Sequence, residues 1–182
     1  MSRIGKQEII IPNTLKVEIN DKVILSNGKV TKETVIPDNI KVVFENNKIL
    51  IKRDNDENKT KALHGLTRKL VANNVAGFQK PFQKILQIKG VGFRATLNGN
   101  KLVLNVGYSH TVALNIPPQI EVKIDAKSNQ ILVESQDKLK LGEFAADIRS
   151  VRPPEPYKGT GIMYLNEKII RKAGKSASSG KK

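Results

Sequence analysis

The chain has 182 residues, of which 38% are hydrophobic and 4% aromatic, with no tryptophan and no cysteine. This allows one medium domain or two small ones with modest cores. The 32 Lys and Arg residues outnumber the 17 Asp and Glu residues, and the net charge of +15 favours an anionic partner, either nucleic acid or an anionic membrane. The lack of cysteine excludes disulfides and thiolate metal sites and is typical of a reducing compartment.

The sequence argues against a membrane protein. Its apolar runs are all much shorter than the roughly 18 residues that a membrane span needs. The N-terminal region lacks the apolar core of a signal peptide, since its longest apolar run covers residues 9–11 and is followed by Pro12. We therefore expect a cytoplasmic protein that binds nucleic acid.

The first half of the chain shows the alternation of half-buried strands. Leu15, Val17 and Ile19 alternate with polar residues, and the Asn-Gly pair at residues 27–28 predicts a hairpin turn. Further strands are predicted before Pro37, around residues 42–44 and around residues 49–51.

A helix is predicted after the polar loop at residues 54–58. Asn58 or Thr60 is expected to cap it, and Gly77 and Pro81 to end it. Its expected apolar face consists of Leu63, Leu66, Leu70, Val71 and Val75. His64 lies beside that face, where we expect a partly buried histidine whose hydrogen bonds are satisfied.

The second half repeats this order of elements, with another Asn-Gly hairpin at residues 98–99. Residues 36–42 align with residues 116–122 at an offset of 80, and residues 49–51 align with residues 131–133 at an offset of 82. Leu63, Leu66 and Leu70 align with Leu141, Phe144 and Ile148. Two copies of one strand-rich unit explain this order, and chance similarity of short strands is the alternative.

The predicted fold is therefore α+β, a tandem duplication of a small, mainly antiparallel sheet packed against one helix. We expect the first repeat over residues 1–81 and the second over residues 82–175. Residues 176–182 should form a disordered basic tail, because they lack apolar periodicity.

A Pro/Gly stretch follows the second predicted helix, where residues 152–162 read Arg-Pro-Pro-Glu-Pro-Tyr-Lys-Gly-Thr-Gly-Ile. Its prolines exclude a helix or a central strand, and its glycines leave backbone that another surface can approach closely. Tyr157 adds a flat ring and Lys158 a positive charge. These features suit a phosphate–sugar surface, although an ordinary surface loop has the same composition.

Residues 89–95, Lys-Gly-Val-Gly-Phe-Arg-Ala, match the dinucleotide-binding fingerprint only formally, because a hairpin follows them and not a helix. Lys89 and Arg94 flank the glycines, and Phe93 adds a ring that can stack on a base. We therefore interpret the segment as exposed backbone that contacts nucleic acid. A glycine bulge in an edge strand is the alternative.

The excess of positive charge gathers at the end of the chain, where residues 149–182 contain 9 basic and 2 acidic residues. Arg149 and Arg152 can cap the second helix or reach a phosphate. The sequence contains no cysteine nucleophile and no His–acid cluster with metal spacing, so we expect no enzyme, no metal, no cofactor and no small-molecule substrate.

Four segments resemble the large-subunit ribosomal protein six family. Residues 154–162 resemble its signature, residues 1–6 with the Ile-Pro pair at 11–12 resemble its start, and residues 89–95 and 106–110 resemble segments of its second domain. One departure is Thr160, where the family commonly has a basic residue.

The resemblance implies a structural protein of the cytoplasmic ribosome that binds large-subunit ribosomal RNA, mainly through its second domain. It implies a place near the base of the factor-binding stalk and the sarcin–ricin loop, beside neighbouring ribosomal proteins and close to translation GTPases. The alternatives are a general nucleic-acid-binding module and a protein-interaction scaffold. The candidate RNA-binding residues are Lys89, Gly90, Gly92, Phe93, Arg94, Ser109, His110, Arg149, Arg152, Pro154, Tyr157, Lys158, Gly159, Thr160, Gly161, Lys168, Arg171, Lys172 and Lys175.

Overall fold

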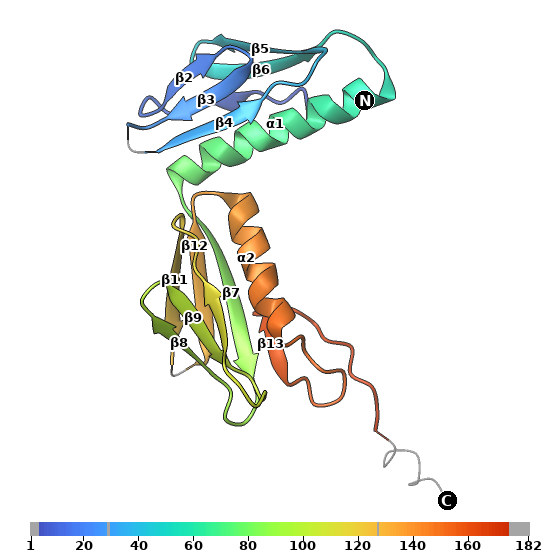
Figure 1. The fold of residues 1–182 in the computed structure, drawn as a ribbon. Coiled ribbons are helices and arrows are strands. Elements are labelled where there is room, and N and C mark those ends of the chain that lie inside the picture. Colours follow the sequence, from blue (N-terminus) through green and yellow to red (C-terminus); the bar gives the residue numbers. More distant parts are fainter. Residues whose placement is uncertain (1–3, 29, 127, 175–182) are drawn as a thin grey trace, which may run out of the picture. The chain divides into compact units, whose positions relative to one another are not determined.

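The structure, a computed structural model, describes residues 4–28, 30–126 and 128–174. The chain divides into two compact units, unit 1 (Met1–Pro81) and unit 2 (Phe82–Lys182) (Figure 1). Each unit combines short antiparallel strands with one helix packed against them. The predicted α+β class and the duplicated arrangement are confirmed, with the difference that each unit contains two small sheets where one was expected. Lys175 and the expected tail at residues 176–182 lie outside the described residues.

Unit 1 has two three-stranded sheets, ordered β1-β6-β5 and β2-β3-β4. Its strands are β1 (Ile9–Ile10), β2 (Lys16–Ile19), β3 (Lys22–Ser26), β4 (Thr31–Val35), β5 (Ile40–Glu45) and β6 (Lys48–Arg53). The β5–β6 hairpin closes with Glu45 opposite Lys48, and both residues between them, Asn46 and Asn47, have positive φ. Asparagine tolerates that conformation better than most residues, which explains the tight turn.

The helix of unit 1, α1 (Asn58–Gln79), differs from its prediction at both ends. The N-cap is Glu57, so neither Asn58 nor Thr60 caps the helix. Gly77 lies inside the helix and is buried, and the helix continues to the residue before its C-cap, Lys80. Glycine lowers helix propensity without forbidding a helix, and burial against the sheets outweighs that cost here.

The predicted apolar face of α1 is also partly wrong. Leu66 is 54% exposed and Leu70 is 38% exposed. The buried residues of α1 are Thr60, His64, Thr67, Val71, Val75 and Gly77. This stripe keeps helical spacing but carries polar side chains, which a prediction based on apolar residues alone does not select.

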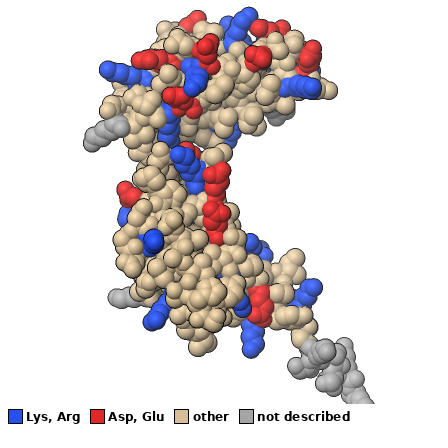
Figure 2. Space-filling view, viewed as in Figure 1, with Lys and Arg blue, Asp and Glu red and all other residues tan. Residues whose placement is uncertain are grey.

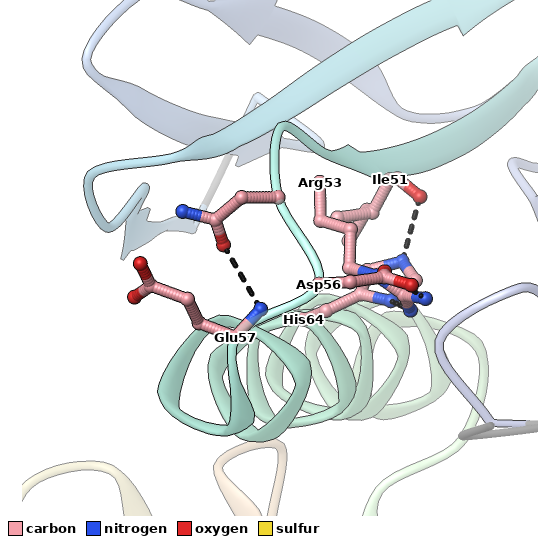
Figure 3. Close-up of polar contacts among 6 residues, drawn as sticks. Ile51, Arg53, Asp56, Glu57 and His64 are labelled. Atoms are coloured by element: carbon pink, nitrogen blue, oxygen red, sulfur yellow. Dashed lines mark hydrogen bonds and ion pairs between the residues drawn. The ribbon is translucent and has the colours of Figure 1, made fainter.

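Figure 3 shows how the buried His64 is satisfied. Its Nε2 donates to the carbonyl oxygen of Ile51 at 2.8 Å, and its Nδ1 lies 3.4 Å from Nη1 of Arg53. Arg53 in turn pairs with Asp56 at 2.7 Å. The expectation of a histidine with satisfied hydrogen bonds is therefore confirmed, and His64 is 3% exposed. Gly5 packs directly on its ring, because an added Cβ would overlap the ring atoms.

Unit 2 has a three-stranded sheet ordered β10-β9-β8 and a four-stranded sheet ordered β11-β12-β7-β13. Its helix is α2 (Lys138–Val151), capped by the side chain of Asp137, which accepts from the amides of Leu139 and Lys140. The strands are β7 (Phe82–Lys89), β8 (Arg94–Asn98), β9 (Lys101–Asn105), β10 (Val112–Asn115), β11 (Ile120–Asp125), β12 (Gln130–Ser135) and β13 (Gly161–Tyr164).

The duplication is visible in single hydrogen bonds. The amide of Ile40 donates to the carbonyl of Pro37, and the amide of Ile120 donates to that of Pro117, at the predicted offset of 80. Each isoleucine is 6% exposed and belongs to the core of its own unit. Among the described strands, β13 has no counterpart in unit 1. Among the described residues, unit 2 therefore has one strand more than unit 1.

The packing of Gly5 on His64 leads to a stability prediction. Gly5→Ala should destabilise unit 1 by about 1–3 kcal/mol, because the added methyl group must displace a buried ring. Gly142→Ala is the matched control, since an added Cβ in α2 meets nothing within 4 Å and alanine favours a helix. Urea unfolding of the full-length chain measures both. Equal stability of the two variants would contradict the packing of Gly5 on His64.

Candidate nucleic-acid interface

The pairing of β13 with β7 brings two of the predicted segments together. Gly161, at the end of the Pro/Gly stretch, lies opposite Lys89 in the sheet. Lys89 ends β7, and the turn that follows is closed by a hydrogen bond from the Phe93 amide to the Gly90 carbonyl. Segments separated by about seventy residues in the sequence therefore meet at one end of unit 2 (Figure 1).

Gly161 makes this meeting sterically possible. An added Cβ would lie 2.6 Å from the carbonyl oxygen of Pro153 and 2.8 Å from Cα of Pro154, and the φ of 140° is also unfavourable for other residues. The next amide, of Ile162, donates to the carbonyl of Arg152 at 2.8 Å. The close approach expected at this glycine is therefore made by the chain's own backbone.

Gly159 is likewise covered by the protein itself. It is buried, and the guanidinium of Arg171 lies 3.4 Å from the position of an added Cβ. The amide of Lys172 donates to the carbonyl of Pro156 at 2.9 Å. The segment after β13 thus returns to the Pro/Gly stretch and places the exposed residues Arg171 and Lys172 near it. Lys168, also exposed, lies earlier in the same segment.

Glu155 connects the two ends of the loop at residues 155–160. Its carboxylate accepts from the Thr160 hydroxyl at 2.9 Å and from the Lys158 amide at 3.3 Å. These hydrogen bonds, the Thr160 bond first, hold the pKa of the Glu155 carboxyl below its usual value. Thr160, which departs from the basic residue expected by resemblance, therefore orders the loop.

Arg149 is held inside unit 2 by an ion pair with Glu167. Its Nε and Nη2 donate to the two carboxylate oxygens of Glu167 at 2.9 and 2.5 Å. The Tyr164 amide donates to the same carboxylate at 3.1 Å. The hydrogen bond from Arg149 is the main reason why the pKa of Glu167 is lowered and that of Arg149 is raised. Arg149 therefore anchors the chain after β13.

The ring of Phe93 links the turn at residues 90–93, which we call the glycine turn, to residues 106–110. An added Cβ on Gly90 or on Gly107 would lie 2.6 or 2.8 Å from this ring. The ring is partly buried and packs against the core of unit 2. The ring of Phe93 therefore lies between the two loops and the core of unit 2. This position does not favour the stacking on a base that the sequence suggested.

Tyr108 was missed as a candidate residue, although it directly precedes Ser109 and His110, which were selected. Its hydroxyl donates to the carbonyl of Val151 at 2.9 Å, at the end of α2. The guanidinium of Arg152 lies 5.0 Å from its ring centroid, and the ring of His110 stacks on it at 5.9 Å. The structure thus brings His110 and Arg152 together through a residue whose role depends on tertiary contacts.

Most of the candidate side chains with charge lie exposed around this end of unit 2, as do the polar Ser109 and the ring of Tyr157. The exposed candidates are Lys89, Gly92, Arg94, Ser109, His110, Tyr157, Lys158, Lys168, Arg171 and Lys172. Gly90, Phe93, Arg149, Arg152, Pro154 and Thr160 are partly buried. Figure 2 shows several Lys and Arg side chains and few acidic ones at the C-terminal end of unit 2, whereas both signs are interspersed over unit 1. We call this end of unit 2, which carries the exposed candidates given above, the basic end.

Unit 1 offers a less suitable site. An open hollow of about 460 Å³ lies beside His64, and its lining mixes Lys6, Lys52 and Arg53 with Asp54 and Asp56. Within the described residues, no group of three or more His, Cys, Asp or Glu side chains could hold a metal ion. No helix of the described ranges, in either unit, is long and apolar enough to cross a membrane.

Comparison with known proteins decides the family. A family model described as "Ribosomal protein L6" matches residues 11–80 and 89–165. The chain belongs to the ribosomal protein L6 family. The family resemblance seen in the sequence motifs is confirmed, and the family's description names a ribosomal protein and no enzyme.

Full-length relatives agree with this assignment. The "Large ribosomal subunit protein uL6" of Caldicellulosiruptor saccharolyticus is 49% identical, and the alignment covers 100% of both chains. The protein of the same name from Carboxydothermus hydrogenoformans is 47% identical, again over 100% of both chains. That of Karelsulcia muelleri is 47% identical over 97% of this chain and 100% of its own.

The ion pair of Glu167 predicts a pH-dependent stability. The folded-state pKa of Glu167 lies below the ordinary value of 4.5, so its contribution is present above pH 4.5 and is lost as the pH falls through the folded-state pKa. Glu167→Gln should therefore lower the free energy of unfolding by about 1 kcal/mol at pH 7 and by much less at pH 3.

Thermal or urea unfolding at both pH values tests this, with Glu143→Gln, an exposed carboxylate of α2, as the control. The control should change stability little at either pH. A Glu167→Gln effect of the same size at pH 3 and pH 7 would show that the ion pair is not its cause.

Proposed function

We propose that this chain is a structural constituent of the large ribosomal subunit and binds large-subunit ribosomal RNA mainly through unit 2. The observation that carries the proposal is the meeting of the glycine turn, residues 106–110 and the Pro/Gly stretch at the basic end. Cationic side chains surround this end, which suits a polyanionic partner of extended shape.

The charges supply most of the affinity in this proposal. Lys89, Arg94 and Lys158 are exposed and can each displace a counterion from a phosphate. Tyr157 is 56% exposed, so its ring is free to stack on an unpaired base or a ribose. If the target is helical RNA, shape and backbone contacts dominate, because its deep major groove hides the base edges.

The distribution of charge supports unit 2 as the main binding unit. Residues 1–81 contain 15 basic and 9 acidic residues, whereas residues 82–182 contain 17 basic and 8 acidic residues. The two acidic residues after position 148, Glu155 and Glu167, both accept hydrogen bonds from within the protein. Because only these two carboxylates stand among the 9 basic residues of 149–182, the segment keeps a net positive field toward a ligand.

The finer location also belongs to the proposal. The names of the relatives support a place in the large ribosomal subunit. The motif resemblance implies the finer location, in the cytoplasmic ribosome near the base of the factor-binding stalk and the sarcin–ricin loop. Neighbouring large-subunit proteins would be partners, and translation GTPases would pass close by. The proposal includes no cofactor, metal or small-molecule substrate.

A salt titration tests the site. Replacing Lys89, Arg94 and Lys158 together with alanine should reduce the slope of log K against log salt by about 2–3, because each phosphate contact contributes about 0.7–0.9. The matched control replaces three exposed lysines of unit 1, Lys16, Lys52 and Lys69. An equal reduction of the salt slope in both triple variants would reject the basic end as the main site.

A comparison of ligands tests the wider proposal. If the wild-type chain bound ribosomal RNA, unrelated RNA and duplex DNA equally, only a general nucleic-acid-binding module would remain.

A further inference from the structure

The most basic part of the chain contains a carboxylate whose role the proposed binding site does not explain. Glu155 lies within residues 149–182, which have 9 basic and 2 acidic residues. The other acidic residue, Glu167, is accounted for by its ion pair with Arg149. A carboxylate beside a phosphate surface repels it, so the position of Glu155 calls for a physical reason.

The hydrogen bonds of Glu155 supply that reason. Its side chain accepts from the Thr160 hydroxyl and the Lys158 amide. Its own amide donates to the carbonyl of Thr160 at 2.9 Å, and its carbonyl accepts from the amide of Gly159 at 3.0 Å. Both the backbone and the side chain of this residue therefore close the loop at residues 155–160.

The apex of this closed loop carries the groups that face outward. Tyr157 is 56% exposed, and Lys158 is exposed while its amide is bound to Glu155. The prolines at positions 153, 154 and 156 already restrict the backbone on one side of the apex. The carboxylate restrains the other side, which includes two residues with positive φ, Gly159 and Gly161.

We propose that Glu155 is a positioning residue of the RNA-binding surface, which with the Thr160 hydroxyl holds Tyr157 and Lys158 in their binding conformation. This inference rests on the proposed function. Ordering the loop before binding removes an entropic cost that the complex would otherwise bear. Glu155 itself makes no contact with a phosphate.

The proposal makes a prediction of opposite sign to simple electrostatics. If Glu155 were only a surface carboxylate, removing its charge would strengthen binding to a polyanion. If it positions the loop, Glu155→Ala should weaken binding about 5–10-fold, since ordering hydrogen bonds are lost. Thr160→Val should also weaken binding although it changes no charge, whereas Thr160→Ser keeps the hydroxyl and should bind within about twofold of the wild type.

The experiment measures the affinity of the full-length chain and these variants for large-subunit ribosomal RNA at several salt concentrations. The salt slope should stay unchanged in the weakened variants, because no phosphate-binding cation is removed. Glu143→Gln, which removes an exposed charge of unit 2 outside the loop, is the charge-matched control and should not weaken binding. Circular dichroism confirms that each variant is folded.

Amide hydrogen exchange of the unbound variants gives a second, independent measurement. The amides of Lys158 and Gly159 should exchange faster in Glu155→Ala and Thr160→Val than in the wild type. Unchanged exchange, or unchanged or tighter RNA binding in these two variants, would overturn the positioning role. Failure of the wild-type chain to prefer ribosomal RNA would instead overturn the proposed function, and the exchange result would still decide whether Glu155 orders the loop.

Discussion

The missing side chain at Gly161 is the constraint on which the basic end depends. The backbone of residues 152–154 passes so close to this residue that a Cβ would lie 2.6 Å from a carbonyl oxygen. A side chain at this position would clash with that backbone where β13 pairs with β7. The pairing in turn sets Lys89 opposite Gly161. A single glycine therefore permits these distant segments to share one surface.

Other internal contacts make that surface rigid and leave its cations free. The ring of Phe93 packs against Gly90 and Gly107, and the Tyr108 hydroxyl donates a hydrogen bond to the Val151 carbonyl at the end of α2. The carboxylates of Glu155 and Glu167 accept hydrogen bonds from Thr160 and Arg149 within unit 2. The acidic groups thus contribute to order, and the basic groups contribute to the outward field. Such a division suits a protein that must present a fixed shape to RNA.

The sequence predicted the features that depend on local chemistry. Alternating strands, the Asn-containing turns and the internal repeat follow from short-range patterns, and the shared Ile40 and Ile120 turns match the predicted offset. The prediction of the buried face of α1 was partly wrong, because polar residues such as Thr60, His64 and Thr67 occupy it. His64 is held there by a hydrogen bond to the Ile51 carbonyl in β6. The contacts of Tyr108 and Gly161 join residues far apart in the sequence, and no local pattern contains them. The candidate segments were found by their composition, whereas the contacts that hold them together required the structure.

Hydroxyl-radical footprinting of the full-length chain, free and bound to large-subunit ribosomal RNA, tests the central claim most directly. Val91 and Tyr157 are 103% and 56% exposed at the basic end, and their side chains should become protected on binding. Phe44 and Leu66 are 40% and 54% exposed in unit 1, and their reactivity should change little. Protection of the unit 1 side chains with Val91 and Tyr157 still reactive would contradict binding through the basic end of unit 2.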